Sequence, residues 1–202
     1  MKSGEILGIG AVIAIILGVL LAVAGPGSKF GTGWQYLTGG SVASNVQQSN
    51  LPPASGSSVV GAPSLTAQQV DAILSNAGSP AAGTGPVFVA DSLQYGIDDA
   101  YALGFFKHES SFGQNGIAAQ TLSIGNIVCT PGYSCIGRFR AYPSWQAGID
   151  DWFKLIKNVY VGQWGATTVE AIIPHYAPSS DNNDEAGYIS AVESDVNAWR
   201  QS

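Results

Sequence analysis

A long run of residues without a single charge, residues 6–24, limits how this chain of 202 residues can fold. At about 1.5 Å per residue, a helix of that length spans the hydrocarbon core of a bilayer, which is roughly 30 Å thick. Residues 25–64 carry one charge, Lys29, and are mostly small, polar or turn-forming. Such a segment cannot form a core or cover a buried helix. The sequence therefore confines the folded domain to residues 65–202, which are long enough for a core of their own.

The N-terminal segment is predicted to be a membrane anchor rather than a cleaved signal sequence. A small-residue cleavage site is present at residues 22–25, "AVAG". The apolar run, however, is longer than most signal cores, and the charges of Lys2 and Glu5 before it cancel. The linker of about 40 residues would let the domain lie some tens of ångströms from the membrane. We expect a membrane-anchored chain whose domain is extracytoplasmic, in the periplasm or at the cell surface.

Charge and cysteine content restrict the ligands. The net charge is −6 and no run of basic residues occurs, which argues against nucleic acid and favours a neutral or cationic ligand. Cys129 and Cys135 flank a turn-forming stretch and predict one disulfide, which requires an oxidising compartment. A metal site would need His108 and His175, which lie in unrelated segments. We expect no metal and no cofactor, and the oligomeric state stays open.

Apolar residues recur at three- and four-residue steps in several segments of residues 65–202, which predicts a mainly α fold of the α+β class. Capping residues and this periodicity predict helices that begin at Ser64, near Pro86, at Asp98, at Ser144 and after Asn183. The helix at Asp98 carries Glu109 on the same stripe as buried-type aromatic residues. Short β-like pieces between Gly113 and Ser144 predict a small hairpin lobe. A cleft between this lobe and the helices would then face Glu109.

Three motifs follow one another in this domain. They are "HESSFG" at residues 108–113, "IGNI" with "FRAYPSW" at residues 124–145, and "HYAPSSDNNDEAGYISAV" at residues 175–192. Each is weak alone, but in this order and spacing the chain resembles the bacterial glucosaminidases of glycoside hydrolase family 73, in the lysozyme-like superfamily. The resemblance covers most of residues 65–202. It implies a lysozyme-like helical domain that acts on the glycan strand of peptidoglycan.

The resemblance implies an acid glutamate at Glu109 and a cleft tyrosine at Tyr176. Glycosidic cleavage needs a carboxyl that protonates the leaving oxygen, with a pKa near the working pH. Aromatic neighbours and the negative end of the helix would raise the pKa of Glu109, whereas a solvated helix-end charge would keep its ordinary pKa. Tyr176 would donate to the sugar or else be a core tyrosine, as we expect for Tyr188. Amide and aromatic side chains predict sugar contacts at Asn126, Gln120, Tyr142 and Phe112.

A second carboxylate, which the family usually offers in the hairpin lobe, is missing: no Asp or Glu occurs between Ser110 and Ile149. We expect Asp150 and Asp151 to be solvated charges on a helix, and Asp181 to lie in a turn. Two routes need one carboxyl group only, namely attack by the substrate's own acetamido oxygen, or the formation of an anhydro-sugar as in lytic transglycosylases. Two alternatives to an enzyme stay open. One is a glycan-binding or assembly module of a cell envelope or of a membrane-containing virion, and the other is a periplasmic scaffold.

Overall fold

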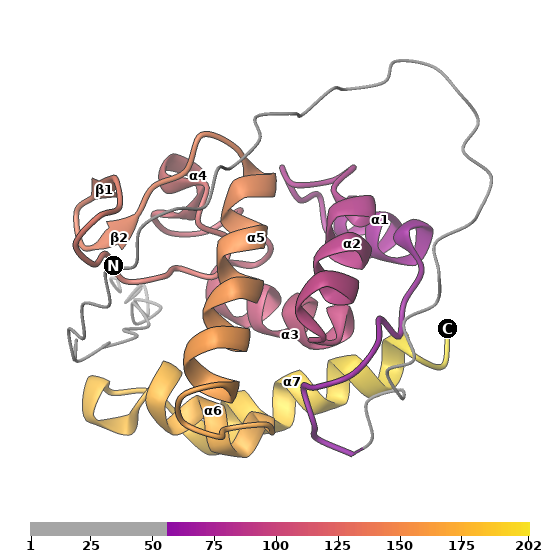
Figure 1. Cartoon of the computed structure of the whole chain (residues 1–202). Coiled ribbons are helices and arrows are strands. Elements are labelled where there is room, and N and C mark those ends of the chain that lie inside the picture. Colours follow the sequence, from indigo (N-terminus) through magenta and orange to yellow (C-terminus); the bar gives the residue numbers. More distant parts are fainter. Residues whose placement is uncertain (1–55) are drawn as a thin grey trace, which may run out of the picture.

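The computed structural model describes residues 56–202, and in this part the chain is mainly helical, as predicted (Figure 1). The α-helices are α1 Ala67–Asn76, α2 Gly85–Tyr95, α3 Asp99–Ser110, α4 Ala118–Thr121, α5 Trp145–Leu155, α6 Val169–Tyr176 and α7 Glu185–Trp199. A π-helix, Ile156–Val161, extends α5, and a 3-10 helix, Ser179–Asp181, follows α6. The strands β1 Cys135–Ile136 and β2 Phe139–Arg140 form an antiparallel hairpin. The predicted anchor lies outside the described residues, and within residues 56–202 no helix has the length and apolarity needed to cross a membrane.

Local capping explains where most helices begin. The side chain of Asp98 accepts a hydrogen bond from the backbone N–H of Ala100 (2.9 Å), and Ser144 caps α5 in the same manner. Both starts were predicted, as was Pro86 in the first turn of α2. The predicted cap at Ser64 is wrong, because Thr66 caps α1 through a reciprocal capping box with Gln69.

Helix α3 forms the middle of the molecule, between α2, α5 and α7 (Figure 1). Lys107 and His108 are its only residues that are not buried. The rings of Phe105 and Phe106 pack against Trp152 of α5, with centroids 5.3 and 5.0 Å apart. Lys107 and His108 leave one face of the last turn open to water, whereas Glu109, in the same turn, lies on the enclosed side.

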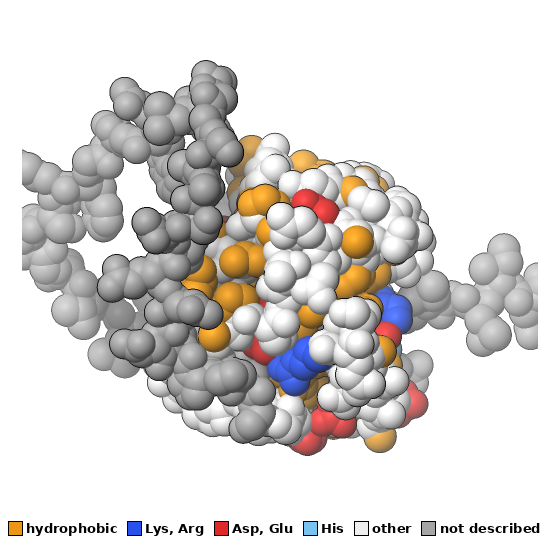
Figure 2. Space-filling view, turned by 90° about the vertical axis from the view of Figure 1, so that its right-hand side faces the viewer, with side chains coloured by type: hydrophobic (Ala, Val, Ile, Leu, Met, Phe, Trp, Pro, Cys, Tyr) orange, Lys and Arg blue, Asp and Glu red, His pale blue; other side chains and the backbone are white. Residues whose placement is uncertain are grey.

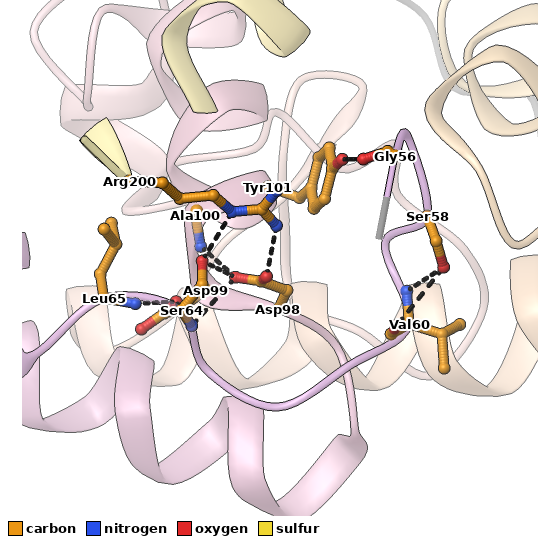
Figure 3. Close-up of polar contacts among 10 residues, drawn as sticks. All are labelled: Gly56, Ser58, Val60, Ser64, Leu65, Asp98, Asp99, Ala100, Tyr101 and Arg200. Carbon is orange, nitrogen blue, oxygen red and sulfur yellow. Dashed lines mark hydrogen bonds and ion pairs between the residues drawn. The ribbon is translucent and has the colours of Figure 1, made fainter. Parts of the chain in front are cut away.

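The segment before α1 belongs to the folded domain, although we expected residues up to 64 to be linker. Val59 is fully buried, and Figure 3 shows how the following residues are held. The backbone N–H groups of Ser64 and Leu65 donate to Asp99 (2.9 and 3.1 Å), and Arg200 forms an ion pair with Asp98 (2.6 Å). The folded unit therefore starts earlier in the chain than its composition indicates.

The predicted disulfide between Cys129 and Cys135 is present and closes the loop of the hairpin lobe. A buried ion pair fastens this lobe to α5. Arg140 of β2 donates to Asp151 (2.6 Å), which also accepts hydrogen bonds from Tyr142 (2.6 Å) and Tyr133 (3.1 Å). Asp151 is therefore buried, and the prediction that it is a solvated charge is wrong. The side of α5 that carries Asp151 faces the lobe and not water.

Replacing Arg140 by methionine is expected to destabilise the protein by about 3 kcal/mol. The substitution leaves the Asp151 carboxylate buried without its counter-charge, and the remaining tyrosine hydrogen bonds offset part of the cost. Denaturant unfolding of both chains measures the difference. The matched control is Lys107→Ala, which breaks an ion pair to Asp195 in which the lysine side chain is 47% exposed, and should cost less than about 1 kcal/mol. Equal effects of the two substitutions would contradict this interpretation.

Candidate active site

Glu109 occupies the last turn of α3, with 7% of its surface exposed. The helix ends abruptly after it, since Ser111 and Phe112 both adopt positive φ angles (48° and 57°). The hydroxyl of Ser110 fixes this turn, because it donates to the carbonyl of Ile124 (2.7 Å) and accepts from the N–H of Gly113 (2.8 Å). The turn thus joins the "HESSFG" segment to the "IGNI" segment beside the carboxyl group.

Tyr188 of α7 donates a hydrogen bond from its hydroxyl to Oε1 of Glu109 (2.7 Å). The other carboxyl oxygen, Oε2, is buried and has no hydrogen-bond partner among the described residues. An oxygen that accepts a hydrogen bond is the weaker site for the proton. In the neutral acid we therefore place the proton on Oε2, which accepts no hydrogen bond from residues 56–202.

Burial raises the pKa of Glu109 from 4.5 to about 8, because desolvation disfavours the carboxylate. The side chains of Tyr188 and Asn126 both act in the opposite direction, but their effects on this pKa are smaller than that of burial. Burial also raises the pKa of Tyr188 well above its ordinary value, so the phenol stays neutral and remains a donor. At neutral pH the pair consists of a protonated carboxyl group and a phenol that holds it in place.

Asn126 lies next to Glu109, as part of the "IGNI" segment. Its Nδ2 donates to the backbone carbonyl of Glu109 (2.9 Å), while its Oδ1 is buried without a partner in residues 56–202. The residue adopts a left-handed backbone conformation, with φ at 48°. A buried polar atom without a partner is costly in a folded protein and calls for an explanation, such as a catalytic role or a bound water molecule or ion. Asn126 and Glu109 together present one unpaired acceptor and one unpaired acid.

Tyr176, predicted to be a cleft tyrosine, is 1% exposed and is bonded to the "IGNI" segment. Its hydroxyl donates to the carbonyl of Gly125 and accepts from the indole N–H of Trp152 (3.1 Å). A Cβ at Gly125 would lie 2.6 Å from the ring of Trp152, so only glycine fits there. Tyr176 thus orders the segment that carries Asn126. This geometry matches the alternative of a core tyrosine whose hydroxyl is satisfied.

The other predicted sugar contacts are dispersed. Gln120 is exposed on α4, and Tyr142 is half-buried with its hydroxyl bonded to Asp151. Phe112 is 4% exposed, which leaves little surface for a ligand. The structure brings Glu109 and Asn126 into direct contact, and the contact roles of the remaining residues stay predictions.

Two hollows in the described part of the chain do not include the carboxyl group of Glu109. One is lined by Lys107, His108, Ala191, Ser194 and Asp195, and the other by Gly56, Ser57, Tyr101, Glu193, Asn197 and Arg200. The predicted cleft at Glu109 is therefore not among these two hollows, and the carboxyl is enclosed.

The face shown in Figure 2 has basic side chains scattered among neutral ones, so no basic patch forms in the described part of this face.

Comparison with known proteins leaves the class of this chain open. No protein-family model matches the chain. No curated protein matches it either. The fold and the site define a mainly helical domain with an enclosed, protonated glutamate.

Proposed function

We propose that this chain is a peptidoglycan hydrolase that cleaves the β-1,4 glycan backbone, as N-acetylglucosaminidases of the lysozyme-like superfamily do. Glu109 is its general acid and base. The uncharged run at residues 6–24 supports a membrane anchor, and the disulfide supports an extracytoplasmic domain. In this proposal the anchor and linker keep the domain within reach of the cell wall.

One observation carries the proposal: a buried carboxyl group, whose raised pKa favours the protonated form at neutral pH, has an oxygen without a hydrogen-bond partner in the described part of the chain. The three motifs that resemble glucosaminidases meet around it. The first supplies Glu109, the second Asn126 and the third Tyr188, and hydrogen bonds of 2.9 and 2.7 Å link the last two residues to the first. A buried carboxyl group with a raised pKa and an unpaired oxygen is a candidate functional group, and at Glu109 it coincides with the meeting of the three motifs.

The chemistry follows from the two carboxyl oxygens. Oε2 gives its proton to the glycosidic oxygen while the bond to the anomeric carbon breaks, and the bonding electrons leave with that oxygen. The hydrogen bond from Tyr188 to Oε1 stabilises the carboxylate that forms. The substrate's acetamido oxygen would donate electrons to the electron-deficient carbon, and Glu109 would then take a proton from the incoming nucleophile. That nucleophile is water in hydrolysis and a hydroxyl of the muramic acid in anhydro-sugar formation.

Neither neighbouring aspartate on α5 is placed to act as a second carboxylate. Asp151 is held by Arg140, and Asp150 accepts a hydrogen bond from Tyr95 (2.8 Å). Asp181, in the 3-10 helix after α6, has one buried oxygen without a partner among the described residues. The engagement of Asp150 and Asp151 by other side chains favours the routes that need one carboxyl group. Since Glu109 is enclosed, binding of a glycan must displace the atoms that cover Oε2.

Mass spectrometry of fragments released from purified peptidoglycan by the full-length chain tests the proposal. Fragments with N-acetylglucosamine at the reducing end are the expected products of hydrolysis. Fragments with anhydro-muramic ends would retain Glu109 as the acid, but the bond cut would be the one at the anomeric carbon of the muramic acid, with its internal hydroxyl in place of water. Binding to peptidoglycan without any released fragment would overturn the enzymatic proposal and favour a glycan-binding module.

A further inference from the structure

The aromatic ring of Tyr188 is held by two side chains of α3. The imidazole of His108 stacks on it, with ring centroids 3.7 Å apart and the ring planes inclined by 26°. The ring of Phe105, one turn earlier in α3, contacts it in a tilted arrangement at 5.6 Å. A stacked partner at this distance limits how far the phenol can swing or tilt. The sequence alone predicts only a structural role for His108, as a residue of the helix that carries Glu109.

We propose that His108 is a positioning residue that acts through Tyr188, keeping the phenol directed at Oε1 of Glu109 so that Oε2 stays unbonded. Tyr188 decides which carboxyl oxygen is occupied, since its hydroxyl lies 2.7 Å from Oε1. His108 in turn stacks on the ring of Tyr188 and lines the hollow that Lys107 and Ser194 also border. The functional meaning of this support rests on the proposed role of Glu109.

The stack does not need a charged imidazole. Partial burial lowers the pKa of His108, although Asp195 and Asp184 act in the opposite direction. Asp195 is itself paired with Lys107 (2.5 Å). At neutral pH the ring is therefore neutral, and phenylalanine should replace it. The hollow beside His108, about 320 Å³, leaves room for a larger ring.

Three variants of the full-length chain test the inference: His108→Ala, His108→Phe and Tyr188→Phe. The pKa of Glu109 is measured by carbon-13 NMR of carboxyl-labelled glutamate, and E109Q identifies the resonance. Tyr188→Phe removes the hydrogen bond to the carboxylate, so it should raise the pKa of Glu109 by roughly one unit. If His108 positions Tyr188, His108→Ala raises that pKa in the same direction by at least half as much. His108→Phe should leave it within a few tenths of a unit of the original value.

Two outcomes would overturn the inference. A fall in the pKa of Glu109 in His108→Ala would mean that the imidazole only shields the carboxyl from water. An unchanged pKa in His108→Ala, beside a raised pKa in Tyr188→Phe, would mean that Tyr188 needs no support. Because His108 is exposed, the alanine variant should fold, and the midpoint of its thermal unfolding checks this. The titration needs no glycan, so it tests the role of His108 separately from the proposed function. The role of His108 can be refuted while peptidoglycan cleavage is confirmed, and it can be confirmed while peptidoglycan cleavage is refuted.

Discussion

Replacing Glu109 by glutamine is expected to stop the release of glycan fragments while binding to peptidoglycan persists. Glutamine has nearly the same shape and can still accept the hydrogen bond from Tyr188 at its carbonyl oxygen. Its amide, however, cannot protonate the leaving oxygen, and the loss of a general acid typically lowers the rate by about 10²- to 10⁴-fold. Fragment release measures the rate, and sedimentation with insoluble peptidoglycan measures binding.

The matched control for this experiment is Glu170→Gln, since Glu170 is an exposed glutamate in the first turn of α6. This variant should release fragments at the rate of the unchanged chain. If E109Q released fragments as fast as Glu170→Gln, Glu109 would not be the acid, and the proposed mechanism would be lost. If E109Q lost binding together with activity, the carboxyl would serve in substrate binding instead.

The same substitution should make the protein more stable, by an amount that grows with pH. In the folded chain Glu109 keeps its proton up to a pKa of about 8, whereas the unfolded chain releases it near 4.5. Between these values the folded state binds more protons, so the stability that the neutral carboxyl contributes is lost as pH rises. E109Q has no proton to lose at this position. Its advantage should be small below pH 4.5 and reach on the order of 5 kcal/mol above pH 8.

Urea unfolding at a series of pH values measures this difference, and comparing the two chains isolates Glu109. Burial also raises the pKa of Asp91 to about 7 and that of Asp99 to about 8, so both chains lose stability over the same range through these groups. Only the difference between the two chains in the free energy of unfolding is due to Glu109. Parallel curves from pH 4 to pH 9 would show that its pKa is not raised by folding, which would contradict a protonated acid at neutral pH.

Local rules were sufficient to predict the helices whose ends are set by short-range chemistry. Asp98 and Ser144 each follow a break in the pattern and precede a periodic apolar run, so their capping bonds could be predicted. The burial of Glu109 followed from its place on the stripe of Phe105 and Phe106. The disulfide followed from the spacing of its two cysteines.

Tertiary partners account for what the sequence did not predict. The role of Tyr188 depends on the packing of α7 against α3, and no local pattern separates it from an ordinary core tyrosine. Its one signal is its position near the start of the last helix in the third motif, and that position alone predicts only packing. Asp151 likewise gains its partner Arg140 only when the hairpin lobe folds onto α5. Composition placed Val59 in the linker, whereas its contacts with the helical body bury it.

Direct titration of the Glu109 carboxyl is the sharpest test of the proposed mechanism. In the full-length chain with carbon-13 at glutamate carboxyl carbons, the resonance missing from E109Q belongs to Glu109, and its shift is followed from pH 3 to pH 10. We predict a midpoint near 8, which would leave a protonated acid available at neutral pH. A midpoint near 4.5, the ordinary value for glutamate, would contradict the mechanism, because at neutral pH Oε2 would then have no proton to give.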